Sequence, residues 1–415
     1  MQLRFLDSIK SIVEKGSNER KRSFFKFILS VPFWVLVASL VIGTFSVVNI
    51  FSILGARKDK SMNEYWQQGT DVRYRHMAVY ASGSRSFGLF SPLTYEEAGG
   101  SLCVSDITTI RTALQNVSDS SNTSGKGNGL KDGKPQGWED CYSSILSANV
   151  ICSSDVNEDG IKTDLSSDTS VIAVSGNFRA FHPYEYLSGG FLPEDEVDKN
   201  QIVINDVLAW TLFKSYDIVG SRITIFNEEF VIVGVVSQST GKIDELVGNE
   251  DPQVFMYFSK LIDVYAGGFF GTSEGMSSSD LAIGCYEAML PEEVSGVANS
   301  DMIAAIPSYT VENNNMYVIS CTGRYNLKNI WNQMIPFGAM EEKYANIDFP
   351  SWEKASQLTL QYLFYDCVAI LMALVLMISA IVSIILRYHA RKAIPALDTL
   401  VTEEIDESEE NKKDF

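Results

Sequence analysis

The sequence predicts an α+β protein in which two transmembrane helices flank a large mixed α/β domain outside the cytoplasm. Two long apolar blocks near the two ends of the 415-residue chain predict the helices, and a polar middle separates them. Within that middle, short β-branched runs alternate with amphipathic segments, which predicts a mixed domain. The formal charge of −19 and the external location of the domain argue against nucleic acid as a partner.

The first apolar block covers residues 27–54 and contains no charged residue. About 20 helical residues cross the hydrocarbon core of a bilayer, so this block is long enough to span it. A cleaved signal peptide is the alternative, but its apolar part is only about 7–15 residues long. The second block covers residues 362–386, and its single charged residue, Asp366, lies near the outer boundary. We therefore expect two uncleaved spans.

Basic residues beside the two blocks predict that both termini are cytoplasmic. They are Arg20, Lys21, Arg22 and Lys26 before the first span, and Arg387, Arg391 and Lys392 after the second. The rule has less force at the start of a long domain, where Arg57, Lys58 and Lys60 weakly favour the opposite orientation. Residues 55–361 are then extracytoplasmic.

Residues 1–26 combine a short apolar pattern with the basic flank. Leu6, Ile9 and Val13 recur at spacings of three and four, which predicts an amphipathic helix on the inner lipid surface of the membrane. A partly disordered leader is the alternative. At the other end, residues 387–415 change from basic to acidic, and we expect a solvated cytoplasmic tail.

Local signals place several elements of the external domain. Residues 104–115 are predicted to form a helix, and the Ser/Gly/Asn-rich residues 119–137 a surface loop. Residues 201–204 are predicted to form a short strand. A helix follows this strand, with Asn205 or Asp206 as its N-cap.

Residues 222–226 and 229–236 are predicted to pair as a hairpin across the turn Asn227-Glu228. Gly234, inside the second arm, indicates a bulge or a close approach of another backbone. The Gly-Lys pair at 241–242 resembles the end of a phosphate-binding loop. Its spacing from Gly234 is too long, however, and an apolar residue follows where Ser or Thr is required, so we expect no nucleotide site.

Cysteine and histidine usage does not predict a metal centre. Five cysteines lie in the external part, so at least one is unpaired; a Cys285–Cys321 pair is plausible, but the connectivity stays open. The histidines, His76, His182 and His389, are too far apart in the sequence to predict a metal cluster. No Gly-x-Ser-x-Gly or His-Glu-x-x-His motif occurs, and we expect neither catalytic residues nor an enzyme.

Calcium is the one cofactor that the sequence leaves open. The stretch Asp-Val-Asn-Glu-Asp-Gly resembles the start of a calcium loop, in which Asp155, Asn157 and Asp159 would supply side-chain oxygens and Ile161 a carbonyl oxygen. The twelfth position of such a loop is a bidentate Glu, but here it is Ser166. An ordinary polar turn accounts for the same residues, and it is the interpretation that we favour.

A series of motifs between residues 175 and 237 follows in a definite order. It comprises Leu187, Gly190 and Phe191, then Val203, Ile204 and Asn205, then Ala209, Leu212 and Phe213, then Val219 and Gly220, and finally Val233, Gly234 and Val235. In this order and spacing, the segment resembles the extracytoplasmic core domain of MacB/FtsX-like ABC-transporter permeases. Residues 252–258 are similar to the strand that leads out of that core domain.

The resemblance implies a division of the external part of the chain. Residues 55–258 would form the core, or porter-like, domain. Residues 259–310 would form an inserted subdomain, and residues 311–361 the return to the core and the segment before the membrane.

The resemblance also implies a function, a set of partners and a location. The chain would be a membrane subunit that couples a partner ATPase to the external domain, for export or mechanotransmission, with ATP hydrolysis on the partner. The implied partners are a cytoplasmic ABC ATPase and a second permease subunit or second copy of this chain, in a bacterial inner or plasma membrane. The residues expected to contact a partner are Leu6, Ile9, Val13, Arg387, Arg391 and Lys392.

The number of spans departs from the family, which normally has four. Either a separate subunit supplies the other two spans, or this protein is an accessory that has lost direct coupling to an ATPase. Two further hypotheses stay open. The chain could be a stand-alone, membrane-anchored binding or scaffold protein derived from the same fold, or a calcium-dependent surface adhesin.

A calcium site at Asp155 predicts that added calcium raises the thermal stability of the external domain. Replacing Asp155 and Asp159 with Asn should remove the increase, because two carboxylate ligands are lost. Thermal unfolding with millimolar calcium, and with magnesium as the control, measures the effect. An unchanged unfolding temperature would rule the site out.

Overall fold

The computed structural model divides the chain into two units, each of which is described here by itself. The helical unit consists of residues 1–55 and 362–415, and the sheet unit of residues Ala56–Gln361. Only the backbone is described in residues 117–120, 126–131, 134–136, 332–334 and 391–410. The described ranges are 30–57, 73–82, 102–120, 126–131, 134–153, 164–237, 241–247, 251–267, 281–292, 294–307, 315–334, 344, 347 and 349–410.

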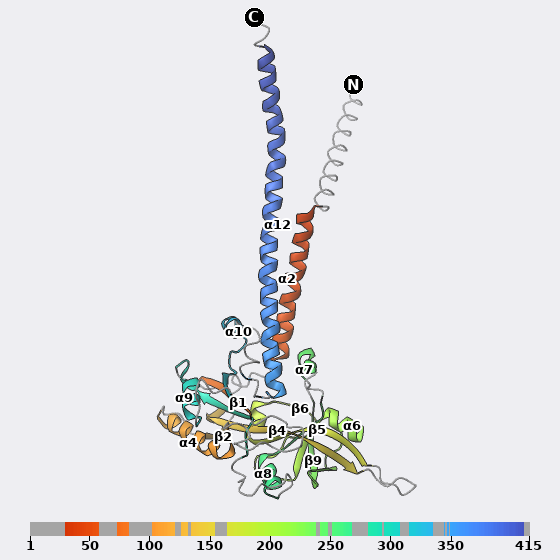
Figure 1. Ribbon diagram of the computed structural model, residues 1–415, viewed down its shortest axis with the longest axis vertical. Helices are drawn as coiled ribbons and strands as arrows, with labels where there is room; N and C mark the ends of the chain where they lie inside the picture. Colours follow the sequence, from red (N-terminus) through yellow and green to blue (C-terminus); the bar gives the residue numbers. More distant parts are fainter. Residues whose placement is uncertain are drawn as a thin grey trace, which may run out of the picture. The chain divides into compact units, whose positions relative to one another are not determined.

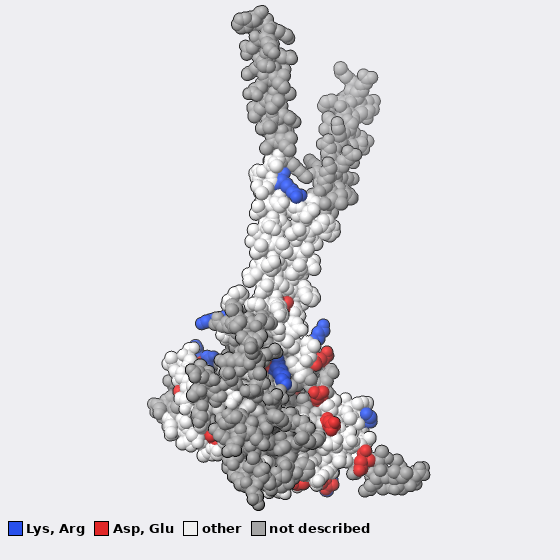
Figure 2. Space-filling model, viewed as in Figure 1, with Lys and Arg blue, Asp and Glu red and all other residues white. Residues whose placement is uncertain are grey.

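The helical unit contains α2 (Val31–Ala56) up to Gly55 and the part of α12 (Ser351–Glu410) that follows Gln361. Among the described residues, α2 and the segment Ser351–Ala390 of α12 are the two helices long and apolar enough to cross a membrane. The core helix of a soluble protein would be mostly buried, but only 17% and 11% of their most apolar windows are buried. Figure 2 shows these helices almost without charged side chains. These features support the two predicted spans.

Small and polar residues hold the two spans together. Ser46 of α2 is buried, and a Cβ added at Gly43 would lie 3.8 Å from the Cβ of Ala373 on α12. The side-chain amide of Asn49 donates a hydrogen bond of 2.7 Å to Asp366. Close backbone approach and interhelical hydrogen bonds drive helix pairing in lipid, where the hydrophobic effect does not.

The described strands of the sheet unit form one ten-stranded mixed sheet and a separate two-stranded ribbon (Figure 1). The sheet contains β1 (Tyr74–Ala81), β4 (Glu139–Ser153), β5 (Asp164–Gly176), β6 (Glu185–Gly189), β7 (Gln201–Asn205), β8 (Arg222–Ile225), β9 (Glu228–Ser237), β10 (Gln253–Tyr257), β11 (Cys285–Pro291) and β12 (Met316–Ser320). Their order is β12-β1-β11-β4-β5-β10-β7-β9-β6, and β8 pairs with β4 and β9. The pairs β5–β10 and β7–β9 are parallel, and the others are antiparallel.

Helices cover one face of this sheet more fully than the other. The helices of the sheet unit are α4 (Val104–Ser120), α5 (Phe178–Phe181), α6 (Asp206–Phe213), α7 (Lys242–Leu246), α8 (Phe258–Ala266), α9 (Val297–Ala305) and α10 (Leu327–Met334). The largest core cluster joins α4, α6, α8 and α9 to one face through Ile110, Leu208, Leu261 and Met302. We call the opposite face, against which α5 and Trp352 of α12 pack, the α12 face.

Two of the predicted helices are confirmed, and the predicted loop is not. Helix α4 includes residues 104–115, and at its start the Asp106 carboxylate accepts the backbone N–H of Cys103 at 3.0 Å. Asn205 caps α6 as expected, accepting from the Leu208 N–H at 2.9 Å. The prediction of a loop over 119–137 was wrong, because β2 (Lys126–Lys131) and β3 (Lys134–Gly137) pair there as a ribbon.

The predicted hairpin exists, with its turn one residue earlier than expected. Ile225 pairs with Glu228, so the two turn residues are Phe226 and Asn227. Both have positive φ angles, 53° and 62°, which matches the twist of a two-residue type I′ hairpin turn. Phe226 is also buried in the main core, which offsets the strain of its left-handed backbone.

Gly234 shows both of the features predicted from its place in a strand, a bulge and a close approach of another backbone. The register between β7 and β9 shifts so that Val203 pairs with Gly234, which leaves Val233 as a bulge. A Cβ at Gly234 would overlap the backbone carbonyl oxygen of Gly190. Only glycine therefore allows β6 and its following turn to lie this close to β9.

The range 259–310, for which the sequence suggests an inserted subdomain, contributes a strand to the main sheet. Strand β11 lies in this range and pairs with β1 on one side and β4 on the other. The segment is thus part of the sheet unit, and the contacts within Ala56–Gln361 form a single compact unit.

Replacing Gly234 with Ala should destabilise the sheet unit by about 1–3 kcal/mol, because the new methyl group forces the β6 turn away from β9. Gly190→Ala is the matched control, since a Cβ there meets nothing within 4 Å. Denaturant unfolding of the full chain, followed by fluorescence, compares the two. Equal losses of stability would contradict the assignment.

Candidate functional site

Strand periodicity places charged and polar side chains on the α12 face at the middle of the sheet. Side chains alternate between the two faces of a strand, and on β1 Met77 and Val79 belong to the main core, so His76 projects toward the α12 face. On the neighbouring strand β11, Glu287 pairs with Ala78 and lies on that same face. A charged residue on the α12 face is buried away from water by the elements that pack on that face.

Glu287 is a buried carboxylate, 2% exposed, shared between two histidines. Its Oε1 lies 3.0 Å from Nε2 of His76, and its Oε2 lies 2.6 Å from Nε2 of His182, which follows α5. The thiol of Cys141 on β4 is 3.8 Å from Oε2. Burial alone would raise the pKa of Glu287, but His182 and then His76 outweigh it and hold the pKa below its ordinary value. One carboxylate thereby joins three strands and the end of α5.

The first turn of α12 packs on this group and carries a second buried pair. The ring centroid of Trp352 lies 4.7 Å from that of His182 and 6.0 Å from that of Phe178. Beside it, Arg324 donates two hydrogen bonds of 2.7 and 2.6 Å to the Glu353 carboxylate, and both side chains are buried. Burial lowers the pKa of Arg324, but the neighbouring Glu353 raises that pKa by a larger amount. The net shift is upward, so this arginine stays charged.

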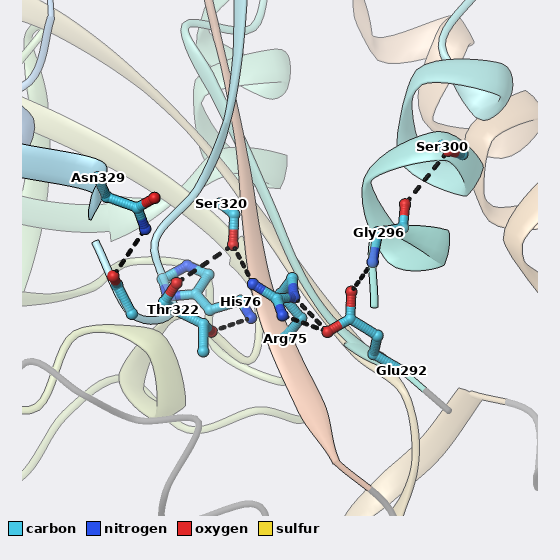
Figure 3. A network of polar contacts seen from close by, with 9 residues as sticks. Arg75, His76, Glu292, Gly296, Ser300, Ser320, Thr322 and Asn329 are labelled. Atoms are coloured by element: carbon cyan, nitrogen blue, oxygen red, sulfur yellow. Dashed lines mark hydrogen bonds and ion pairs between the residues drawn. The ribbon is translucent and has the colours of Figure 1, made fainter. Parts of the chain in front are cut away.

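A third set of contacts continues from His76 to the edge of the sheet (Figure 3). The His76 backbone N–H donates to the Thr322 hydroxyl at 2.9 Å, and Nη1 of Arg75 donates to the Ser320 hydroxyl at 3.2 Å. Arg75 also pairs with Glu292, which accepts the N–H of Gly296 at 2.8 Å at the start of α9. Strands β1 and β12 and helix α9 are therefore held in one network beside Glu287.

The residue that follows α2 has its own buried partner. Arg57 Nη1 lies 3.1 Å from the Asp244 carboxylate of α7, and both side chains are buried. Lys242, the lysine of the Gly-Lys pair, lies exposed on the same short helix. The segment that resembled a phosphate loop therefore supplies Asp244 as the partner of Arg57. We call the buried groups around Glu287, Glu353 and Arg57 the polar junction.

The structure places none of the predicted site residues in the polar junction. The possible calcium ligands Asp155, Asn157, Asp159 and Ile161 lie between β4 and β5, outside the described residues, as do Leu6, Ile9 and Val13. Arg387 is exposed on α12, and Arg391 and Lys392 belong to the part of α12 whose side chains are not described. The calcium site and the partner contacts stay predictions.

Cys285 and Cys321 are free thiols rather than a disulfide. Cys285 pairs with Tyr80 of β1, whereas the Cys321 N–H donates to the His76 carbonyl, four residues along the same strand. Four residues of a strand span about 13 Å, and a disulfide needs Cα atoms within about 7 Å. Within the described residues, no group of three or more His, Cys, Asp or Glu side chains could hold a metal ion.

The sequence pattern did not predict the pairing of His76 and His182 on Glu287. Distance along the chain was the argument against a histidine cluster, but the sheet brings both rings onto one carboxylate. A usable signal was present, since His76 and Glu287 each interrupt a strongly apolar strand at an inward position. A buried charge in such a strand requires partners, and histidine is one of the few that can supply them.

The geometry of the two units defines a class of protein. Two exposed apolar helices and a large α/β sheet unit indicate a membrane protein with a folded domain outside the bilayer. Its sequence matches the family described as the MacB-like periplasmic core domain over residues 33–283, which is more than half of the chain. The chain therefore belongs to this family, and it is a membrane component of an ABC transporter. The resemblance inferred from the motifs is confirmed.

Two solved structures are similar to this chain. The periplasmic region of MacB from Actinobacillus actinomycetemcomitans shares 13% identity and a TM-score of 0.36, covering 63% of this chain and 92% of that one. The extracellular domain of the noncanonic ABC-type transporter YknZ from Gram-positive bacteria shares 10% identity and a TM-score of 0.34, covering 59% and 99%. A search among curated proteins gave no match.

Glu287→Gln should destabilise the sheet unit by about 3 kcal/mol near neutral pH, because both histidines lose a charged partner in a buried place. The folded pKa of Glu287 is depressed, so its contribution is complete above the ordinary value of 4.5 and is lost as the pH falls below that value. Denaturant unfolding of both proteins as a function of pH measures the difference.

The two stability curves should converge in acid. Glu229→Gln is the control, because Glu229 pairs with Arg222 on the surface and should change stability by less than about 1 kcal/mol. Curves for the wild type and Glu287→Gln that stay parallel down to pH 3 would contradict the role of Glu287.

Proposed function

We propose that this chain couples a cytoplasmic ABC ATPase to its extracytoplasmic sheet unit. The observation that carries the proposal is helix α12, which begins in the sheet unit at Ser351 and continues as one helix to Glu410. A helix of 60 residues is about 90 Å long, three times the hydrocarbon thickness of a bilayer. Membership of an ABC-transporter family supplies the class of partner.

The polar junction is suited to pass on a movement of α12. Glu353 is held by Arg324 in two hydrogen bonds, and Trp352 lies against His182, which in turn is bound to Glu287 at the centre of the sheet. Because these groups are buried and paired, a displacement of the first turn of α12 moves the sheet with it. Side chains that were exposed and unpaired would yield instead.

The cytoplasmic end of α12 is where we place the contact with the ATPase. Arg387, Arg391 and Lys392 lie just beyond the apolar part of the helix, and Pro395 follows them. Proline lacks the N–H for an intrahelical bond, so Pro395 removes one backbone hydrogen bond from α12 close to these basic residues. In this proposal, Leu6, Ile9 and Val13 supply a second contact, and ATP hydrolysis takes place on the partner.

An ABC ATPase should co-purify with the full chain in mild detergent, because α12 and residues 1–26 offer it a cytoplasmic surface. The double variant Arg391→Ala/Lys392→Ala, which keeps Arg387 and the N-terminal basic cluster as topological signals, should reduce its recovery several-fold. Quantitative mass spectrometry of the purified complex measures this. Recovery of no ATPase would favour the alternative, a stand-alone binding or scaffold protein.

A variant with an interrupted α12 distinguishes coupling to the ATPase from mere association with the ATPase. Two glycines inserted after Gln361 weaken the helix between the polar junction and the span. The variant should retain the ATPase but lose any ATP-dependent change in the fluorescence of Trp352, with Trp352→Phe as the blank. An ATPase that binds without any ATP-dependent change in the unmodified chain would identify an accessory protein without coupling.

A further inference from the structure

A pocket opens in the sheet unit at the end of β5. Its volume is about 360 Å³, and its walls come from the end of β5, the start of α5, the loop after β6 and the end of β10. Small-molecule sites have volumes of about 300–1,000 Å³, so the pocket has the size of a small ligand rather than of a folded partner. Phe178 in its wall also packs on His182 and Trp352, with ring centroids 4.4 and 6.0 Å apart, so the pocket adjoins the polar junction.

One wall of the pocket is aromatic. The rings of Phe178 and Phe191 stack with centroids 6.1 Å apart. The Tyr257 hydroxyl donates a hydrogen bond of 2.7 Å to the Pro193 carbonyl oxygen, which fixes the loop after β6 beside these rings. Leu192 and Pro193 complete the apolar lining. Such a wall can hold the apolar body of a ligand, and aromatic faces also attract cations.

Carboxylates outnumber guanidinium groups around the pocket. The charged residues that line it are Glu139, Glu194, Glu196, Arg111 and Arg179. The charge of Arg111 is balanced by the fully buried Asp140, through hydrogen bonds of 2.7 and 3.0 Å. Arg179 and Glu194 are 58% and 64% exposed and only 3.5 Å apart at their nearest atoms, and exposed pairs of this kind interact weakly. The pocket therefore carries a net negative charge.

Glu196 is the carboxylate that the fold holds most firmly at this wall. Its Oε2 accepts a hydrogen bond of 2.6 Å from the hydroxyl of Ser259, a partner without charge. Its φ angle of 48° is uncommon for a residue other than glycine, and it persists because the surrounding contacts fix the loop. Burial, and then the charges of Glu196, Asp195 and Asp198, raise the pKa of Tyr257 to about 12. The loop thus makes the electrostatic potential at the aromatic wall negative.

We propose that this pocket binds a small organic amine, whose apolar body packs on Phe191 and Tyr257 and whose ammonium group pairs with Glu196. The site goes beyond the coupling function, and binding requires no ATPase. The competing interpretation is an anion held by Arg111 and Arg179. An anion would lie beside Glu196, however, and like charges this close repel each other.

Three probes of nearly the same shape separate charge from size. Tyramine, tyrosol and phloretate share one phenolic body and end in an ammonium group, a hydroxyl and a carboxylate. Isothermal titration calorimetry of the full chain in nanodiscs near neutral pH, with empty nanodiscs as the blank, measures their binding. Tyramine should bind saturably and about ten-fold more tightly than the other two, because a hydrogen bond between charged groups is the stronger one. The absence of saturable tyramine binding, equal binding of tyrosol, or tighter binding of phloretate would overturn the proposal.

Two substitutions with opposite expected effects test the assignment of Glu196. Glu196→Gln keeps the length of the side chain and an acceptor for Ser259, so it should weaken tyramine binding about ten-fold and leave tyrosol binding unchanged. A merely structural effect would change both. Arg179→Gln should strengthen tyramine binding, because it removes a cation that competes for the carboxylates. Glu229→Gln, which removes a surface carboxylate paired with Arg222, is the matched control and should change neither affinity. Unchanged tyramine affinity in Glu196→Gln, or weaker binding in Arg179→Gln, would contradict an ammonium group at this site.

Discussion

The sheet unit depends on one buried carboxylate. Glu287 lies at the centre of the α12 face, and its two oxygens are occupied by His76 and His182, at 3.0 and 2.6 Å. A lone charge in this position would cost several kcal/mol, so the strand can carry it only if β1, β11 and the end of α5 are all in place. An apolar contact would fix the positions of these elements less strictly, because a hydrophobic core tolerates small displacements that a hydrogen-bonded charge does not.

The constraint that buried Glu287 places on its neighbours extends to α12 through aromatic and ionic contacts. The His182 ring, fixed by Glu287, forms part of the surface on which Trp352 packs, and the next residue, Glu353, is fixed by Arg324. The orientation of the first turn of α12 is thus set by groups from the middle of the sheet. A permease domain that transmits movement needs such a defined attachment, since a loosely packed helix end would absorb the movement instead of passing it on.

Local chemistry predicted much of the fold. The apolar blocks gave both spans, the amide of Asn205 gave the cap of α6, and Gly234 gave the bulge and the close approach of Gly190. The hairpin turn was misplaced by one residue because a bulky residue such as Phe226 is rarely chosen for a positive φ angle. Burial of its ring in the main core overrides that local preference. The ribbon β2–β3 was missed because glycine-rich composition indicates a loop.

The candidate site was less accessible from the sequence, because its residues meet only through long-range strand pairing. His76 and Glu287 are 211 residues apart, and His182 and Glu287 are 105 apart. Their contact requires β11 to insert between β1 and β4, and β11 comes from the range 259–310, which the resemblance assigned to an inserted subdomain. Spacing rules for metal and catalytic sites do not detect such a group. The informative signal was energetic: a charged residue inside an apolar strand needs a partner.

The two arginine pairs of the polar junction restrict the geometry of the fold rather than add to its stability. Arg57 Nη2 and Arg324 Nε are buried without a hydrogen-bond partner among the residues that the structure describes, so neither pair is fully satisfied. Apolar side chains of similar volume would often stabilise the fold as well or better, because they avoid the cost of removing charges from water. The pairs instead restrict how the elements that carry them can pack, because a guanidinium group binds a carboxylate in few geometries and cannot lose its charge. Both pairs lie inside the sheet unit, one on α7 and the other on the first turn of α12. We infer that their role is to select one packing of α7 and of the first turn of α12 within this unit.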